Sequence, residues 1–81
     1  MDKYLQLTKH LQASTDNKPT LTFAEIEYLI GSKLPESAYR HFAWWSNDIS
    51  HVQAKSWLDA GFKTTNLSTS IPDQIVEFER T

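Results

Sequence analysis

The sequence predicts an α+β fold of the winged helix-turn-helix type, with three to four helices followed by a C-terminal antiparallel β-hairpin. Two adjacent helical patterns flank the short segment 31–34, which has the length of a helix-helix turn. After Gly61 the periodicity changes from helical to alternating, as it does where a chain enters a sheet. We expect residues 1–81 to form a single domain, because a chain of this length has room for one hydrophobic core.

The first helix is expected over residues 2–13, where apolar side chains recur every three or four positions and so share one face. Turn-forming residues at 14–19 end this helix. Residues 20 and 21 then form a short extended segment, which is a candidate for pairing with the C-terminal hairpin. The apolar face of the first helix consists of Tyr4, Leu7 and Leu11.

The second helix is expected over about residues 23–30, between two clear boundary signals. Thr22 and Glu25 have the spacing of a capping box, in which each side chain accepts a hydrogen bond from the other residue's backbone N–H. Gly31 follows the last apolar position, where a left-handed residue commonly ends a helix.

The third helix is expected over residues 35–47, with Pro35 in its first turn. Its inward stripe would consist of Ala38, Phe42 and Trp45, and its outward side would carry Arg40 and Asn47.

A fourth, short helix and the hairpin complete the predicted fold. Ser50 and Gln53 predict a second capping box that opens a helix over about 51–60, which Gly61 ends. Strands over 62–67 and 74–80 would then be joined by a loop at 68–73. On the last strand Val76 and Phe78 would face inward, and Glu77 and Glu79 outward.

Composition argues against several functional classes. Without cysteine, the chain has neither disulfides nor thiolate metal sites, and no apolar run has membrane-spanning length, so we expect a cytoplasmic protein without membrane contact. His10, His41 and His51 lie in separate segments, which argues against a metal site. Ser37 and His41 could touch on one helix, but no oxyanion-hole motif accompanies them. We therefore expect no enzyme, no catalytic residue and no cofactor.

One functional interpretation is a nucleic-acid-binding module, a monomer or a homodimer, whose third helix enters the DNA major groove. Arg40 and Asn47 have side chains that can read base edges. The net charge of −2 opposes nonspecific binding to phosphate, and the loop of the hairpin has no basic residue. Phosphates would be contacted by Lys33 and Ser37, with electrostatic support from Lys55 and Lys63.

A second interpretation is a protein-interaction module. Trp44 falls off the inward stripe of the third helix, and it would either be covered by the last helix or serve, with Tyr39, as a partner-binding residue. A phage or mobile-element protein that inhibits a host nuclease would be one form of this role. The helix order and the outward Arg40 and Asn47 favour nucleic acid, whereas the acidic balance and the uncharged loop favour a protein partner. Of the two, nucleic-acid binding is the expected function and protein interaction the alternative.

Four motifs extend over nearly the whole chain: Leu21-Thr22-Phe23-x-Glu25-Ile26-Glu27 with Gly31, Leu34-Pro35-x-Ser37-Ala38, Trp44-Trp45-x-Asn47, and Gln53-Ala54-x-x-Trp57-Leu58-x-Ala60-Gly61-Phe62. Together they resemble a small uncharacterised bacterial domain family, whose members look like stand-alone proteins or modules attached to bacterial or phage proteins. The resemblance implies one intact domain and no established activity. Family members often have Arg where this chain has Tyr39, Phe42 and Glu79, so the resemblance implies a less basic copy.

Overall fold

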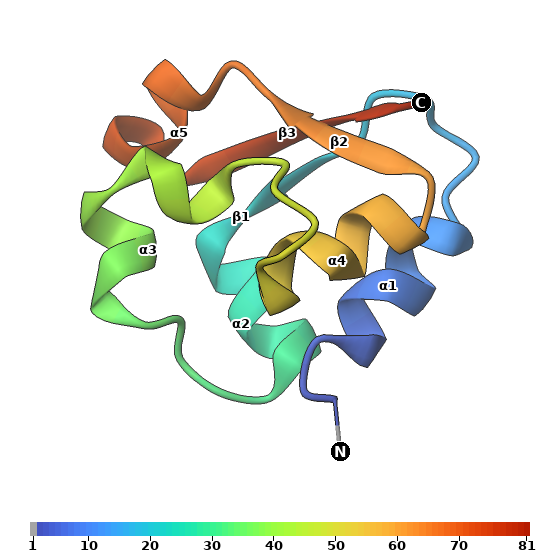
Figure 1. Cartoon of the computed structure of the whole chain (residues 1–81), viewed down its shortest axis with the longest axis horizontal. Coiled ribbons are helices and arrows are strands. Elements are labelled where there is room, and N and C mark those ends of the chain that lie inside the picture. Colours follow the sequence, from blue (N-terminus) through green and yellow to red (C-terminus); the bar gives the residue numbers. More distant parts are fainter. Residues whose placement is uncertain (1) are drawn as a thin grey trace.

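The computed structural model describes residues 2–81, which form five α-helices, one short 3-10 helix (η1) and a three-stranded antiparallel sheet. In Figure 1, α1, α2 and α4 lie beneath the sheet, while α3 and α5 lie near one end of it. In chain order the elements are α1 (Leu5–Gln12), β1 (Thr20–Thr22), α2 (Phe23–Ile30), α3 (Glu36–Arg40), η1 (Phe42–Trp45), α4 (Val52–Asp59), β2 (Phe62–Thr65), α5 (Leu67–Asp73) and β3 (Ile75–Arg80).

The two boundaries of α2 are confirmed. Glu25 N donates to Thr22 Oγ1 at 3.0 Å, and Thr22 N donates to Glu25 Oε1 at 2.9 Å, which makes the reciprocal capping box. Gly31 has a φ of 74° and ends the helix in the left-handed conformation.

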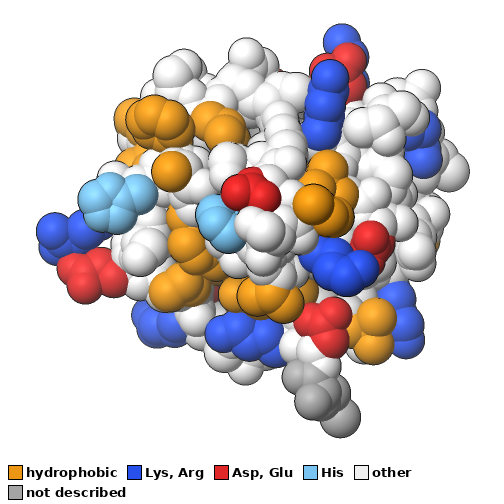
Figure 2. Space-filling view, viewed as in Figure 1, with side chains coloured by type: hydrophobic (Ala, Val, Ile, Leu, Met, Phe, Trp, Pro, Cys, Tyr) orange, Lys and Arg blue, Asp and Glu red, His pale blue; other side chains and the backbone are white. Residues whose placement is uncertain are grey.

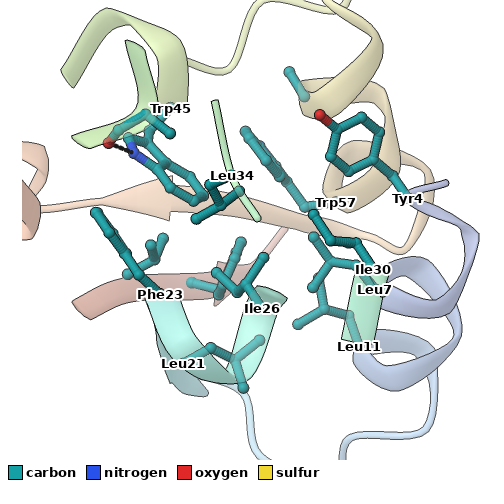
Figure 3. Close-up of a cluster of buried hydrophobic side chains, with 14 of the residues drawn as sticks. Tyr4, Leu7, Leu11, Leu21, Phe23, Ile26, Ile30, Leu34, Trp45 and Trp57 are labelled. Carbon is teal, nitrogen blue, oxygen red and sulfur yellow. Dashed lines mark hydrogen bonds between the residues drawn. The ribbon is translucent and has the colours of Figure 1, made fainter. Parts of the chain in front are cut away.

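The predicted length of the third helix, residues 35–47, is wrong, because α3 ends at Arg40. His41 is extended, with φ −127° and ψ 111°. In a continuous helix the Ala38 carbonyl would accept from the backbone N–H of Phe42. Here it accepts instead from the indole Nε1 of the fully buried Trp45, at 2.9 Å (Figure 3). The chain continues as η1, so Phe42 is 61% exposed and does not lie on the inward stripe.

The second predicted capping box is also wrong. Ser50 Oγ donates to Asp48 Oδ1 at 2.7 Å, so the Ser50 hydroxyl is bonded to the carboxylate two residues earlier and does not cap the helix. Gln53 Nε2 donates to the Trp44 carbonyl at 3.0 Å. As a result, α4 begins at Val52 without a side-chain cap, and Gln53 links its first turn to η1.

The last two strands pair antiparallel, as expected, but they do not form a simple hairpin. The helix α5 stands where the connecting loop was predicted, between residues in the left-handed region, Asn66 (φ 53°) and Gln74 (φ 54°). The strand order is β1-β3-β2, so β1 also pairs with β3, as the candidate pairing of residues 20 and 21 anticipated. The α+β class is therefore confirmed, whereas the winged helix-turn-helix form is not.

The core joins the sheet to the helices through stacked aromatic side chains (Figure 3). The ring centroids of Trp45 lie 5.0 Å from those of Phe23 and 6.0 Å from those of Trp57. Trp57 in turn meets Phe78 at 6.0 Å. Aromatic pairs of this kind add about 0.5–1.5 kcal/mol each beyond area burial. The inward positions of Val76 and Phe78 are confirmed.

Candidate interaction site

The most distinctive surface feature is a shallow hollow between the α3–η1 segment and the start of α4. It is open to solvent, has a volume of about 560 Å³, and its lining surface is mostly apolar. Figure 2 shows hydrophobic and histidine side chains gathered on this face of the molecule, over the left half of the view. We call it the η1–α4 hollow, and its lining residues are Ser37, His41, Ala43, Trp44, Ser50, His51, Val52 and Gln53.

Trp44 connects this hollow to the core. Its ring is half-buried and lies 4.6 Å from the ring of Trp45, edge to face, and 6.4 Å from that of Tyr4. Gln53 fixes the backbone beneath it by donating to its carbonyl. Trp44 is therefore neither fully buried, as covering by the predicted helix 51–60 would make it, nor fully exposed. One part of it packs against the core and another part lines the hollow.

Three large hydrophobic side chains in the stretch 42–52, which contributes most of the lining of the hollow, are exposed. Phe42 is 61% exposed, Ile49 59% and Val52 63%. Phe42 lies between two lining residues in the chain, Ile49 directly precedes a third, and Val52 is itself a lining residue. Sequence reasoning missed the exposure of Phe42 because helical spacing placed this residue inside. The available signal for the other two was that Ile49 precedes the predicted helix 51–60 and that Val52 lies off its buried edge.

Near the hollow lie one pair of charges of opposite sign and one further carboxylate. On α3, Arg40 and Glu36 are 2.8 Å apart and largely exposed. In the loop before α4, Asp48 lies 3.9 Å from His51 Nε2. Hydrogen bonds from the side chain and backbone of Ser50 hold the pKa of Asp48 below its ordinary value, so this carboxylate stays ionised.

Asn47, predicted to read bases, lies beyond η1 and not on α3. Its Oδ1 accepts from Thr64 N at 2.9 Å and from Trp57 Nε1 at 2.9 Å, while its Nδ2 donates to the Thr64 carbonyl at 3.1 Å. The side-chain amide thus pairs with Thr64 as the backbone of a neighbouring strand would. The placement of Asn47 beside Arg40 on one outward helix face is therefore wrong.

Tyr39, predicted to bind a partner, is half-buried and linked to α2. Its hydroxyl donates to Glu27 Oε2 at 2.6 Å, and the same oxygen accepts from Leu34 N at 2.9 Å. Its ring meets Phe23 edge-on at 5.2 Å. The bonds from Tyr39 and Leu34 lower the pKa of Glu27, and the carboxylate raises the pKa of Tyr39.

The other residues predicted to contact nucleic acid lie on several elements. Ser37 and Arg40 are exposed on α3, and Lys33 is exposed in the loop before it. Lys55 on α4 is bound to Asp59 at 2.8 Å, and this hydrogen bond raises its pKa. Lys63 on β2 stands opposite Glu79 of β3. Lys33, Ser37 and Arg40 thus share the segment 33–40, whereas Lys55 and Lys63 lie on other elements.

The three histidines are not brought together. His41 and His51 line the η1–α4 hollow, whereas His10 lines a smaller one with Glu25, Tyr28 and Leu29. Among residues 2–81, no three His, Cys, Asp or Glu side chains are grouped as metal ligands would be. None of the helices in this part of the chain has the length and hydrophobicity that a bilayer crossing demands.

A family model described as a domain of unknown function matches residues 4–80. The match confirms the resemblance to an uncharacterised family that the sequence motifs indicated. No curated protein and no solved structure matches the chain.

Proposed function

We propose that this chain, which belongs to DUF7662, a family of domains of unknown function, is a non-enzymatic module that binds a protein partner through the η1–α4 hollow. The observation that carries the proposal is the apolar hollow itself, lined by Trp44 and by Val52, whose side chain is 63% exposed. Exposed apolar surface is typical of interaction sites when it forms a patch.

Simple energetics support this role. Full burial of a large apolar side chain is worth about 1.5–3 kcal/mol. Phe42, Ile49 and Val52 each retain more than half of their exposure, so a partner that covers them would gain roughly 1–2 kcal/mol from each. Trp44 adds an aromatic ring to the lining of the hollow. Because this ring already packs against Trp45, less side-chain entropy is lost on binding.

The proposal shifts the interaction surface from the pair Tyr39 and Trp44 to the side chains around Trp44. The hydroxyl of Tyr39 is engaged by Glu27, so this residue serves the α2–α3 connection. An inhibitor encoded by a phage or mobile element, directed against a host nuclease, is one form of protein-binding module compatible with this surface.

A photo-crosslinking experiment tests the proposal. A photoreactive amino acid is placed at position 52 in cells that produce the chain naturally, and a matched chain carries it at Gln12, which is exposed on α1. We expect protein adducts at position 52 that are at least tenfold more abundant than at position 12. Equal or absent adducts at the two positions would contradict a protein-binding role of the hollow.

Nucleic-acid binding is the second candidate role, and the exposure of Lys33, Ser37 and Arg40 within residues 33–40 favours it. Against it stand the bonds of Asn47 to Thr64 and the Arg40–Glu36 pair, which leave fewer groups for bases and phosphates. Binding to duplex DNA, measured from low to moderate salt, tests this role. Affinity that falls with salt and drops further in Arg40→Ala would support it, and undetectable binding at low salt would remove it.

A further inference from the structure

We infer that α5 is a strap that opens on its own, while the sheet and the helices α1, α2 and α4 stay folded. This opening is independent of the proposed protein-binding role. The strap packs against β3, η1 and α3, and Figure 1 shows it at the periphery of the molecule. When it opens, the sides of these three elements that it covers become accessible, including a side of η1, the element that carries Trp44.

Both ends of α5 are held in a strained backbone conformation. Asn66 precedes the helix with a φ of 53°, and Gln74 follows it with a φ of 54°. The left-handed region is unfavourable for a residue that has a Cβ, although Asn tolerates it better than most. The side chain of Asn66 also makes no capping hydrogen bond to the first turn. An opened segment frees both residues to leave this region, so opening relieves strain at each end of the strap.

Two polar groups within α5 lack the hydrogen bonds that would hold the helix closed. Pro72 lies inside the helix and has no N–H, so the carbonyl of Ser68, four positions earlier, receives no helical hydrogen bond from it. Ser70 is only 2% exposed, and its Oγ has no hydrogen-bond partner among residues 2–81. A buried hydroxyl without a partner destabilises the state that buries it. Opening gives both groups to water.

The apolar attachment of α5 to the core is small. Its hydrophobic side chains that face the core, Leu67 and Ile71, are only partly buried. In contrast, each of α1, α2 and α4 has two hydrophobic side chains that are at most 1% exposed, namely Leu7, Leu11, Phe23, Ile26, Ala54 and Trp57. The free energy of a local opening rises with the apolar surface that it exposes. We therefore expect α5 to open more readily than these three helices.

Thiol labelling of the full chain tests this inference, because the chain has no cysteine of its own. Ser70→Cys places a single thiol on the buried side of α5. Ser56→Cys is the matched control, since Ser56 is 4% exposed and lies in α4. A disulfide reagent in excess labels each variant without urea and at urea concentrations below the unfolding transition, and thermal melts check that both variants fold. Amide hydrogen exchange of the wild type is a second measurement, which requires no substitution.

We expect the thiol at position 70 to react at least about tenfold faster than the thiol at position 56. Its rate should change little with urea, because a local opening exposes little surface, whereas the rate at position 56 should rise steeply. Adding Gln74→Gly should slow labelling at position 70 roughly two- to fivefold, because it removes the strain that opening relieves.

In the wild type, the amides of α5 should exchange at least about tenfold faster than that of Phe78 in the central strand. Equal labelling rates at positions 70 and 56, or an equally steep dependence on urea, would overturn the inference. If Ser70→Cys does not melt cooperatively, the wild-type exchange decides, and α5 amides that exchange no faster than that of Phe78 overturn it.

Discussion

Asn47 illustrates how a residue with the chemistry of a base reader can serve the fold instead. Its amide offers the same donor and acceptor that would recognise adenine. In this molecule both groups are used by Thr64, and its oxygen also accepts the indole proton of the fully buried Trp57. Residue type and approximate place were readable from the sequence, but the partners were not, because they lie 10 and 17 positions away.

Replacing Asn47 should therefore cost stability. In Asn47→Ala, the buried indole N–H of Trp57 and the backbone of Thr64 lose their partners, for which we expect a loss of about 2–4 kcal/mol. Urea denaturation followed by tryptophan fluorescence measures this. Gln12→Ala, on an exposed position of α1, is the control and should change stability by less than about 0.5 kcal/mol. A loss as small as in that control would show that Asn47 is not a clamp.

Glu27 predicts an acid-sensitive connection between α2 and α3. Because bonds from Tyr39 and Leu34 lower its pKa below the ordinary 4.5, its contribution to stability is present above pH 4.5. That contribution is lost as pH falls through the lowered pKa, since protonation removes the charge that these donors bind.

Glu27→Gln keeps an acceptor oxygen but has no charge to lose. We expect the variant to be about 1 kcal/mol less stable at pH 7, given two charge-assisted bonds at a partly exposed site. The difference from wild type should shrink as the pH is lowered from 5 to 3. Denaturant midpoints across that range measure it, and a difference that stays constant would contradict the role of the charge.

At the scale of elements, the two boundaries of α2, set by neighbouring residues, were predictable, whereas the start of α4 and the boundaries set by distant contacts were not. The capping box and Gly31 act within a few positions of the ends of α2, and both were read correctly. The helix ends at Arg40, and the indole N–H of Trp45 donates to the Ala38 carbonyl. Helical periodicity does not encode this hydrogen bond. The segment 67–73 has the composition of a loop, yet it forms α5 between two left-handed residues.

Gly31 offers a clean test of backbone strain. Its φ is 74°, and a Cβ added there would meet no atom within 4 Å. Gly31→Ala should therefore cost about 1 kcal/mol from conformation alone, without a steric clash. Gly31→Asn should cost less, because Asn tolerates this region better. Thermal melts of the two variants give the comparison, and an Asn variant less stable than the Ala variant would contradict this explanation.

The opposite substitution should help at the end of α5. Gln74 has a φ of 54°, which costs a residue with a Cβ about 1 kcal/mol. We expect Gln74→Gly to raise stability by about 0.5–1 kcal/mol, as read from the melting temperature. Asp73→Gly, one position earlier and inside α5, is the matched control and should lower stability by a similar amount. If both variants were destabilised equally, strain at Gln74 would not be the explanation.

For the whole molecule, composition and periodicity gave the α+β class, but the arrangement of the strands decides the architecture. A winged helix was predicted from the order of the helices, the turn at 31–34 and a C-terminal hairpin whose strands were expected to be joined by a loop at 68–73. In the chain, α5 connects β2 to β3. In the sheet, β1 pairs with one edge of β3 and β2 with the other, so β3 is the central strand. The function stays a proposal, because a hollow built from α3, η1 and α4 depends on how these elements meet.

The position of β3 predicts what truncation will do. Val76 and Phe78 are at most 1% exposed, and the strand pairs with both of its neighbours. Removing residues 75–81 should abolish cooperative unfolding, measured by circular dichroism on heating. Removing Thr81 alone should lower the melting temperature by only a few degrees, since its bonds reach only the Gly61 carbonyl. Cooperative melting of the 1–74 fragment would contradict the central role of β3.

Of the three strands, β3 is synthesised last, yet it is the central strand of the sheet. This order has a consequence during protein synthesis. Thr22 ends β1, but its strand pairs with Ile75–Glu77 of β3, which itself runs on to Arg80 beside β2, far later in the chain. At ordinary elongation rates the ribosome needs roughly 3–12 seconds to cover that distance. Throughout this interval the nascent polypeptide carries β1, and later β2, without their shared neighbour. A ribosome that stalls late on this message would release a product unable to complete its sheet.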